Sequence, residues 1–574
     1  MNAMRISLLD ELRLSIASGL RNRTLTTCAR WAQARRIMGA PVPGPYTFLY
    51  HPWCREIHDA QCPYITAKKS AQAGFTEIAI NRALFTIDVH KRSVLYVLPT
   101  KVPDAADFSA VRFGGALELS PYLNSMFTDT NKIDLKQAAG AALYIRGANS
   151  ESGLKSIPVS ELILDEYDEM SEKAVGLALE RLSGQIHKHV FMLSTPTIPS
   201  YGIDLQYQRS TQEHFFFPCP SCSRLIELKW PESFEVCGET PNDPDRFRSR
   251  LLCYECKATL STHESGLIKE QDGWLDVTKA HMLGPGQWTP TCDNSSDHRG
   301  FHINQLYSAT ISPCEIAERY LIGLRSEIAM QEFQNSKLGN AYLASDAQVR
   351  EEHVQAAVER GTHLITDARP LTSRGRVITM GIDQGKWNYV VVCEWFYTEM
   401  GYDLNANARC KVLWAGKVGE GDFGQFDRLM REWQVRHCVI DADPNSNDAR
   451  RFARRFPGTV TLSRYRRGVV GREVVIGDED TGAPMATVDR TNWMDAALGR
   501  FYNGSIDLPK DIPLEYREQI KAPARRYETD DDGNITARYI ETGPDHYAHA
   551  QTYAELALPL AAAGVSARSI SSFL

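Results

Sequence analysis

The segment Lys68-Lys69-Ser70-Ala71-Gln72-Ala73-Gly74-Phe75-Thr76 decides how this 574-residue chain is interpreted. A triphosphate site needs a strand, a glycine-containing loop and a helix, so that backbone amides and the helix N-terminus face the phosphates. It also needs a lysine for positive charge and a hydroxyl that holds magnesium. The segment contains these parts in a rearranged order, because Phe75 stands where a lysine normally precedes the hydroxyl. Alone, such a Lys-Lys-Ser turn is usually structural.

Two apolar runs downstream favour the nucleotide interpretation. Glu161-Leu162-Ile163-Leu164-Asp165-Glu166 predicts a buried strand that ends in paired carboxylates, one for the magnesium shell and one for the attacking water. Val190-Phe191-Met192-Leu193-Ser194-Thr195-Pro196-Thr197 predicts a strand that ends in small hydroxyl residues. Solvated strand ends would explain either run alone, but the order of the three segments favours an ATPase. Together with the strand predicted at 93–99, they indicate a parallel α/β sheet within residues 46–212.

A second pattern consists of two Cys-x-x-Cys turns, at Cys219 and Cys222 and at Cys253 and Cys256. Each turn presents two thiolates, so the four cysteines predict one closed, structural, tetrahedral zinc site. Buried, unpaired thiols are the alternative. The 13 cysteines are few for the length, which favours a reducing compartment over a disulfide-rich secreted protein.

Three aspartates mark the C-terminal half. Asp383 follows an apolar run at 377–382 that forms a predicted hairpin with 390–395, Asp441 ends a later strand, and Asp545 opens the final helix. Metal-dependent phosphodiester cleavage needs carboxylates that converge from separate strands and a helix on two cations. Each aspartate alone is typical of a strand end or a helix cap. The set of three predicts a ribonuclease-H-like nuclease.

The charge of the chain limits how it contacts nucleic acid. The net charge is −7, with 24% charged and 43% hydrophobic residues, so the molecule is not a generally basic nucleic-acid binder. Local patches have to supply DNA contacts, and seven arginines follow the Asp441 strand: Arg450, Arg451, Arg454, Arg455, Arg464, Arg466 and Arg467. They predict sequence-independent phosphate contacts, and a solvated helix face is the alternative. No window approaches the ~20 apolar residues that span a bilayer, so no membrane association is expected.

These motifs resemble the large terminase subunits of tailed bacteriophages, within them the lambda-like (GpA) group. The displaced lysine in Lys-Ser-x-x-x-Gly-x-Thr is similar to that family's variant phosphate loop, and Leu-Asp-Glu-x-Asp and Ser-Thr-Pro-Thr match its later motor motifs. The cysteine turns, Val488-Asp489-Arg490-Thr491-Asn492-Trp493 and Asp545-His546-Tyr547-Ala548-His549-Ala550 also resemble segments of the group. The likeness runs from about residue 46 to 557.

The resemblance implies roles for individual residues. Lys69, with Lys68 second, is the phosphate lysine; Thr76 and Asp165 hold magnesium; Glu166 positions the water, with Asp168 and Glu169 as a competing acid pair. The other nucleotide contacts implied are Trp53 at adenine, and Ser70, Gln72, Gly74 and Phe75 in the loop. Arg181 is an arginine-finger candidate, with a surface salt bridge as its alternative. Asp383, Asp441 and Asp545 are the nuclease ligands for Mg²⁺ or Mn²⁺, with Asp443 and His549 auxiliary.

The resemblance also implies an organisation and partners. We expect an N-terminal helical segment (1–45), an ASCE-type P-loop ATPase (46–212), a zinc-ribbon insertion (213–300), a helical linker (301–360) and a nuclease domain (361–574). The expected cofactors are ATP, Mg²⁺ and Zn²⁺. The expected partners are double-stranded DNA, a small terminase subunit and the portal of the procapsid, with a homo-oligomeric ring during packaging in the host bacterial cytoplasm.

Two alternatives remain open at this point. A helicase or other DNA motor whose ribonuclease-H-like domain is not catalytic would share the motor motifs. A zinc-ribbon DNA-binding or assembly protein with a degenerate nucleotide fold would not hydrolyse ATP, and the retained Lys69, Thr76, Asp165 and Glu166 argue against it.

Overall fold

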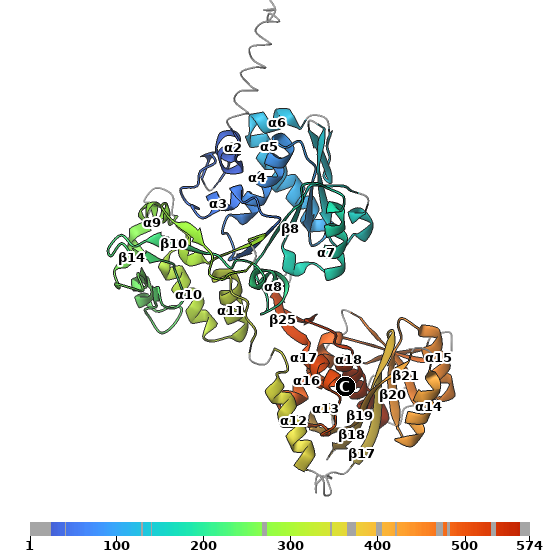
Figure 1. Cartoon of the computed structure of the whole chain (residues 1–574). Coiled ribbons are helices and arrows are strands. Elements are labelled where there is room, and N and C mark those ends of the chain that lie inside the picture. Colours follow the sequence, from blue (N-terminus) through green and yellow to red (C-terminus); the bar gives the residue numbers. More distant parts are fainter. Residues whose placement is uncertain are drawn as a thin grey trace, which may run out of the picture. The chain divides into compact units, whose positions relative to one another are not determined.

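The computed structural model describes residues 25–40, 42–127, 130–138, 140–155, 157–266, 273–294, 296–344, 347–363, 375–397, 404–419, 422–466, 474–478, 483–529 and 535–562. The chain divides into two compact units, Met1–Leu343 and Ala344–Leu574 (Figure 1). The predicted N-terminal helical segment lies largely outside the described residues, which begin at residue 25 and include the helix α2 (Cys28–Arg35). No described helix is both long and apolar enough to cross a membrane.

An eight-stranded sheet organises the first unit, in the order β16-β3-β9-β8-β4-β7-β6-β5. The first six strands in this order are parallel, and β6 and β5 join by antiparallel pairing. The strands are β3 (Tyr64–Lys69), β4 (Val94–Leu98), β5 (Thr130–Asn131), β6 (Leu135–Ala138), β7 (Ala141–Gly147), β8 (Glu161–Asp165), β9 (His189–Ser194) and β16 (His298–Ile303). The strands predicted at 93–99 and within 161–166 and 190–197 are confirmed as β4, β8 and β9. Because β9 lies between β3 and β8, the sheet has the predicted ASCE-type order. The phosphate-loop candidate, the acids and the hydroxyl residues all lie at the carboxyl ends of these parallel strands, here called the carboxyl edge of the sheet.

The central helix of the first unit is α4 (Phe75–Asp88), which begins directly after the loop that follows β3. Every residue from Ile78 to Asp88 is buried, as expected for a helix inside a core. Besides α2 and α4, the described α-helices before residue 210 are α3 (Cys54–Asp59), α5 (Gly114–Leu119), α6 (Pro121–Met126), α7 (Glu172–Leu179) and α8 (Gly202–Gln208). This packing fixes where the loop between β3 and α4 starts and ends.

The segment between β9 and β16 contains two small sheets. One pairs β10 (His214–Pro218) with β11 (Leu225–Ile226) and β15 (Gln287–Thr289); the other pairs β12 (Phe234–Glu235), β13 (Arg250–Leu252) and β14 (Thr259–Thr262). The helix α9 (Val277–Leu283) lies between β14 and β15 in sequence, and α10 (Pro313–Gly323) and α11 (Glu327–Glu332) follow β16. The strand β16 spans the expected boundary at residue 300 and returns the chain to the edge of the first sheet, beside β3.

The second unit is built on another eight-stranded sheet, in the order β22-β23-β21-β20-β17-β18-β19-β24. The predicted hairpin is confirmed, since β17 and β18 are antiparallel neighbours, and β17 is also parallel to β20. The strands are β17 (Gly375–Asp383), β18 (Trp387–Tyr397), β19 (Ala408–Gly419), β20 (His437–Asp441), β21 (Val460–Tyr465), β22 (Val475–Asp478), β23 (Pro484–Val488) and β24 (Ile506–Asp507). This arrangement confirms the predicted ribonuclease-H-like sheet.

Helices cover both faces of the second sheet. Its apolar clusters combine β17 and β18 with α14 (Phe423–Glu432) and α15 (Ser446–Arg455) on one face. On the other face lie α12 (Glu351–His363), α16 (Arg490–Tyr502), α17 (Leu514–Lys521) and α18 (His546–Ala562). A short helix, α13 (Leu404–Asn407), and a separate hairpin of β25 (Pro523–Thr529) and β26 (Ile535–Glu541) complete the unit.

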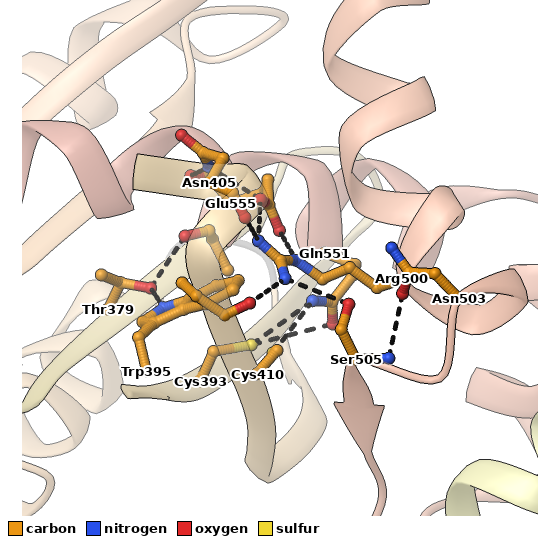
Figure 2. Close-up of polar contacts among 12 residues, drawn as sticks. Thr379, Cys393, Trp395, Asn405, Cys410, Arg500, Asn503, Ser505, Gln551 and Glu555 are labelled. Carbon is orange, nitrogen blue, oxygen red and sulfur yellow. Dashed lines mark hydrogen bonds and ion pairs between the residues drawn. The ribbon is translucent and has the colours of Figure 1, made fainter. Parts of the chain in front are cut away.

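Helix α18 is held in place at two points, one on the sheet and one on α16. At Gly381 on β17, an added Cβ would lie 2.0 Å from the Ala550 carbonyl oxygen, so only glycine permits this approach. Farther along, Arg500 donates from Nε and Nη2 to the two carboxylate oxygens of Glu555, each at 2.6 Å. Figure 2 shows this buried pair and the further bond from Arg500 to the Asn405 carbonyl. Because breaking a buried pair leaves an uncompensated charge, these bonds fix the helix that carries Asp545 at its start.

Candidate functional site

The loop after β3 is shaped for close approach of an anion. Gly74 adopts φ +83° at the N-cap of α4, a conformation that glycine tolerates without strain. The amides of Ser70 and Ala71 donate to the carbonyls of Ile303 and Ser336, at 3.0 and 2.8 Å. The amides in the first turn of α4 have no partner within a helix, so they are the donors available to phosphate.

Backbone contacts from a distant segment brace this loop. Gly339 has φ +63°, and a Cβ there would lie 2.8 Å from the Ser70 amide nitrogen. Phe75 is 1% exposed, so its ring belongs to the core and only its backbone is at the loop. The Ser70 hydroxyl is buried with no hydrogen-bond partner among the described residues, while Thr76 is half-buried at the second position of α4. No sequence pattern indicated that residues 336–339 brace the loop.

The two lysines at the end of β3 have different partners. Lys69 is 6% exposed and its Nζ lies 3.1 Å from Glu166 Oε1. Lys68 forms an ion pair with Asp204 on α8 at 2.9 Å, and its Nζ lies 4.7 Å from the centre of the Tyr207 ring. Adjacent strand residues point to opposite faces of a sheet, which explains the division. Only Lys69 therefore faces the carboxylates that follow β8.

Asp165 lies buried at the end of β8. Its Oδ2 accepts a hydrogen bond from the Tyr96 hydroxyl at 2.6 Å. Burial raises the pKa of Asp165 to about 6; the charge of Glu166 raises it further, and Lys69 lowers it. Glu166 adopts φ +58°, a left-handed conformation that is costly for a non-glycine residue. Strained backbone and a perturbed carboxyl in one place are typical of functional sites.

The second acid pair divides into two environments. Asp168 is 4% exposed; its Oδ2 accepts from the Thr197 amide and hydroxyl at 2.9 and 2.8 Å, and its Oδ1 from the Ile203 amide at 2.6 Å. It therefore ties the acid strand to the Ser-Thr-Pro-Thr segment. Glu169 is exposed on the short helix after Glu166. The Glu166 carboxylate, by contrast, lies against Lys69.

Trp53 is not placed to contact adenine as predicted. The side chain is 2% exposed, and its Nε1 donates to the Ala73 carbonyl at 2.9 Å. Its ring packs edge-on against Phe215 and Tyr307. An indole enclosed in this way supports the loop from inside and offers no face to a base, so the predicted adenine contact is replaced by a positioning role.

Arg181 lies at the opposite edge of the sheet from the loop. Its carbonyl accepts from the Val159 amide, which precedes the start of β8, and its Nε donates to the Leu177 carbonyl at 3.2 Å. Phosphates at the carboxyl ends of the strands are a full strand length away. Arg181 is therefore not an arginine finger for the loop of its own chain.

The four predicted zinc ligands converge. Their sulfur atoms all lie within 4.8 Å of one another, with Cys219–Cys256 at 3.9 Å and Cys222–Cys253 at 4.0 Å. A tetrahedral Zn²⁺ with bonds of about 2.3 Å separates its ligand sulfurs by nearly this distance. The amide of Ala258 is the largest of the influences that lower the pKa of Cys256 to about 7, which favours the thiolate. These residues therefore fit a closed zinc site.

Asp383 and Asp441 end neighbouring parallel strands, because Ile382 pairs with Ile440 in the register of β17 and β20. Burial raises the pKa of Asp441 to about 6, and the charge of Asp383 adds to the rise. Asp443 donates its amide to Asp441 Oδ1 at 3.1 Å and is itself exposed, in an ion pair with Arg464 at 3.3 Å. Two carboxylates at the ends of neighbouring strands suit a divalent cation that neutralises both.

Asp545 stands with other partners at the start of α18. Its Oδ2 lies 3.3 Å from His549 Nε2 and 3.4 Å from Arg490 Nη2. Burial would raise the pKa of Asp545, but the contacts with His549 and Arg490 outweigh it and lower the pKa. Asp545, His549 and Glu541 have donor atoms within 4.8 Å of one another. Among the described residues, the three predicted aspartates do not form a group that tight.

Three residues of this site escaped the sequence predictions: His546, Arg490 and Glu541. His546 Nδ1 lies 2.8 Å from Asp383 Oδ2, and its ring stacks on Tyr389 with centroids 4.6 Å apart. His546 and Arg490 both lie inside segments quoted above, and their neighbours Asp545 and Asp489 were the available signal. Glu541 ends β26, and no local pattern marked it.

The predicted DNA-binding arginines differ in how they are held. Arg450, Arg451, Arg454 and Arg455 lie on α15, Arg464 lies near the end of β21 and Arg466 follows that strand, while Arg467 lies outside the described residues. Arg451 pairs with Asp448 at 3.3 Å and Arg455 with Asp427 at 2.8 Å. Because β21 is parallel to β20, with Ser463 beside Asp441, Arg464 and Arg466 lie at the edge that carries the acids.

Comparisons with known proteins agree with this geometry. Residues 40–274 match the family model described as "Phage terminase large subunit gpA, ATPase domain", and residues 298–407 match "Terminase large subunit gpA, endonuclease domain". Together the two models match more than half of the chain. Nothing among the curated proteins matches.

Solved structures of phage proteins also align with the chain. The large terminase of bacteriophage HK97 aligns over 93% of this chain and 99% of its own, with 10% sequence identity and a TM-score of 0.45. The large terminase of a thermophilic bacteriophage aligns over 86% of this chain and 93% of its own, with 11% identity and a TM-score of 0.27.

Proposed function

Because the chain belongs to the gpA family of phage terminase large subunits and is both an ATPase and an endonuclease, we propose how its residues divide the two activities. ATP is hydrolysed at the carboxyl edge of the first sheet, and DNA is cut at the carboxyl edge of the second. The observation that carries this assignment is common to both edges: largely buried carboxylates end parallel strands there, which is where ligands bind in open α/β sheets. ATP-driven packaging of viral DNA and its metal-dependent cutting follow.

At the motor site, Lys69 contacts the phosphates, and the amides from Gln72 to Thr76 face them at the start of α4. Thr76 and Asp165 hold magnesium, which neutralises charge between the phosphates. Glu166 orients the attacking water. Support for Glu166 over Glu169 comes from the ion pair with Lys69 at 3.1 Å, because that lysine places the carboxylate beside the phosphate loop.

The coupling of hydrolysis to movement is assigned to the segment after β9. Asp168 bonds to Thr197 and Ile203, and Asp204, on the same segment, bonds to Lys68. The segment from 194 to 208 is thus attached to the acid strand and to the phosphate strand at once. A change at the γ-phosphate would alter both attachments. Lys68 is a coupling residue in this assignment and does not contact phosphate.

At the nuclease site, Asp383, Asp441 and Asp545 hold Mg²⁺ or Mn²⁺, with His549 auxiliary. The metal ions, when bound, activate the attacking water and stabilise the leaving oxygen. The chain's own contribution is to hold the carboxylates: Gly381 lets α18 approach β17, and His546 fixes one oxygen of Asp383. Asp443 is exposed and paired with Arg464, which supports an outer position.

Structural Zn²⁺ is proposed for Cys219, Cys222, Cys253 and Cys256. The insertion that contains them is built on two small sheets of short strands, and a closed metal site stabilises such a segment outright. Removal of zinc with a chelator should therefore release about one metal per chain and destabilise this insertion, which elemental analysis and a thermal scan would record.

Double-stranded DNA is the substrate of both sites, and the arginines of α15 with Arg464, Arg466 and Arg467 are proposed to contact its phosphates without reading bases. A small terminase subunit selects the cutting site, and a ring of copies docks on the portal in the host cytoplasm. These partners follow from the family and not from a contact surface described above.

The test separates the two activities with one variant for each. We expect Glu166→Gln to lose DNA-stimulated ATP hydrolysis and to keep Mn²⁺-dependent cleavage, and Asp383→Asn to do the reverse. Glu169→Gln is the matched control and should retain hydrolysis. Cleavage by Asp383→Asn equal to the wild type would instead indicate a DNA motor whose ribonuclease-H-like domain is not catalytic.

A further inference from the structure

Arg490 occupies a position in the nuclease site that neither the family assignment nor the proposed ligands explain. It is the first residue of α16 and follows the N-cap Asp489. Its Nη2 lies 3.1 Å from Glu541 Oε1, 3.4 Å from Asp545 Oδ2 and 3.2 Å from His549 Nε2. These three partners are the group whose donor atoms lie within 4.8 Å of one another. One guanidinium nitrogen is therefore in contact with a complete set of metal-type donors.

Because of the contact with His549, Arg490 and a metal ion cannot occupy this cluster at the same time. The Tyr465 hydroxyl lies 3.1 Å from His549 Nδ1, so that nitrogen is occupied and Nε2 is the ring atom left to face the cluster. Nε2 lies 3.2 Å from Arg490 Nη2 and 3.3 Å from Asp545 Oδ2, so a metal ion bound to it would have to replace both contacts. The guanidinium and a metal cation would also repel each other at this distance. Arg490 in its present position and a metal on His549 cannot be bound together.

The opposite half of the site differs in its countercharge. Asp383 is bonded to His546, and the neighbouring charges that raise the pKa of Asp441 are the carboxylates of Asp383 and the exposed Asp443. No ion pair joins an arginine or a lysine to Asp383 or Asp441 among the described residues. A first divalent cation at this pair has no ion pair with an arginine or lysine to break, whereas a second one at Asp545 has to displace a guanidinium.

We propose that Arg490 is a built-in counter-ion that competes with the second metal ion of the nuclease site. While Arg490 is bound to Asp545, Glu541 and His549, only the half of the site formed by Asp383 and Asp441 binds a metal ion readily. Displacement of Arg490 completes the pair of cations that in-line cleavage requires. The side chain is 31% exposed, so it has room to swing out toward solvent, where a DNA phosphate can take the place of its carboxylate partners. The inference rests on the proposed nuclease function.

The test measures Mn²⁺ binding to the full-length chain in the absence of nucleotide. Calorimetry and electron paramagnetic resonance are the two methods that detect the binding. The wild type should show a tighter and a weaker nuclease site, both absent in Asp383→Asn/Asp545→Asn. Arg490→Ala should tighten the weaker site by about tenfold, a typical size for a change in the immediate surroundings of metal ligands. Arg490→Lys, which keeps a charge but loses the planar fork, should fall between them.

Controls separate this role from a structural one. Arg376→Ala removes an arginine from the opposite end of β17, where it pairs with Glu394, and should leave Mn²⁺ binding unchanged. The Mn²⁺ concentration for half-maximal DNA cleavage should fall in Arg490→Ala in parallel with the tighter binding. Unchanged or weaker Mn²⁺ binding by Arg490→Ala, with its melting temperature retained, would overturn the proposal. No Mn²⁺ binding by the wild type would instead contradict the nuclease function itself.

Discussion

The carboxyl edge of the first sheet (the motor edge) and that of the second sheet (the nuclease edge) place their aspartates in the same way, but the charged groups around these aspartates differ. In both, a largely buried aspartate ends a parallel strand, and burial raises its pKa to about 6, in Asp165 as in Asp441. At the motor edge a lysine from β3, which β9 separates from β8, already faces the acids: Lys69 is ion-paired with Glu166. At the nuclease edge the acids have two histidines and Arg490 around them. An ion-paired lysine prepares the motor edge for an anionic nucleotide, whereas the acids of the nuclease edge contact histidines and one arginine.

The largest expected effect on this contrast comes from replacing each of the two lysines of β3 by alanine in turn. Lys69→Ala should lower DNA-stimulated ATP hydrolysis by roughly a hundredfold to a thousandfold, as expected when a charge aimed at the reacting group is removed. Lys68→Ala, its matched neighbour, should retain phosphate binding and hydrolysis and lose mainly the coupling to DNA movement. Steady-state hydrolysis with and without DNA measures both. Equal losses in the two variants would show that the countercharge is not local to Lys69.

A second test asks how much the nuclease edge depends on one glycine. In Gly381→Ala the new methyl would lie 2.0 Å from the Ala550 carbonyl oxygen and 2.3 Å from the Ala554 amide nitrogen, both backbone atoms. We expect a loss of about 3 kcal/mol in the free energy of unfolding of the second unit, the upper part of the range for overpacking. Cleavage should fall with it and ATP hydrolysis should not, as denaturant titration and the two activity assays would show.

The control for that change is Gly499→Ala, within α16. Nothing lies within 4 Å of a Cβ at this position, so the variant should gain up to about 1 kcal/mol from helix propensity. If Gly381→Ala is as stable as Gly499→Ala, then α18 is not positioned by its contact with β17, and another contact has to bring Asp545 to the edge.

Much of this contrast was predictable from the sequence because strand ends are local features. An apolar run followed by an acid fixes both the strand and the edge, and Asp165, Asp383 and Asp441 were found in that way. The countercharges were not predictable, since Arg490 and Glu541 reach Asp545 from other elements, 55 and 4 residues away in the chain. Trp53 failed for a related reason: an aromatic residue before a loop has the same sequence signature whether it is buried beneath the loop or open to a ligand.

A smaller effect follows from the opposite pKa shifts within the nuclease edge. Folding favours the protonated form of a carboxyl whose pKa is raised, so Asp441 lowers stability increasingly as the pH rises from about 4 to about 6. In metal-free protein, Asp441→Asn should therefore add about 2 kcal/mol to the free energy of unfolding of the second unit at pH 7.5. The gain should disappear below about pH 4, where the wild-type carboxyl is protonated in both states.

Asp545→Asn should have the opposite sign in the same assay. The pKa of Asp545 is lowered, so its ionised form stabilises the fold above the pKa of the unfolded chain, and that stability is lost as the pH falls. Removing the charge at pH 7.5 should destabilise the second unit. Denaturant titrations with a chelator at the two pH values measure both variants. The same sign in both would mean that Arg490 and His549 do not distinguish the two halves of the site.

The smallest effect concerns how the nuclease edge, where no lysine is ion-paired with Asp383 or Asp441 among the described residues, attracts a polyanion. Arg466 is exposed beside the acids, whereas Arg455 is already bound to Asp427. Arg466→Ala should reduce the slope of log K against log salt for duplex DNA by about 0.9, the value for one phosphate contact, irrespective of sequence. Arg455→Ala should change it less, and Arg376→Ala, at the far end of β17, not at all. If all three variants give the wild-type slope, DNA reaches the carboxylates by a path that does not include these arginines. The nuclease edge would then bind metal ions without itself supplying the contacts that attract DNA.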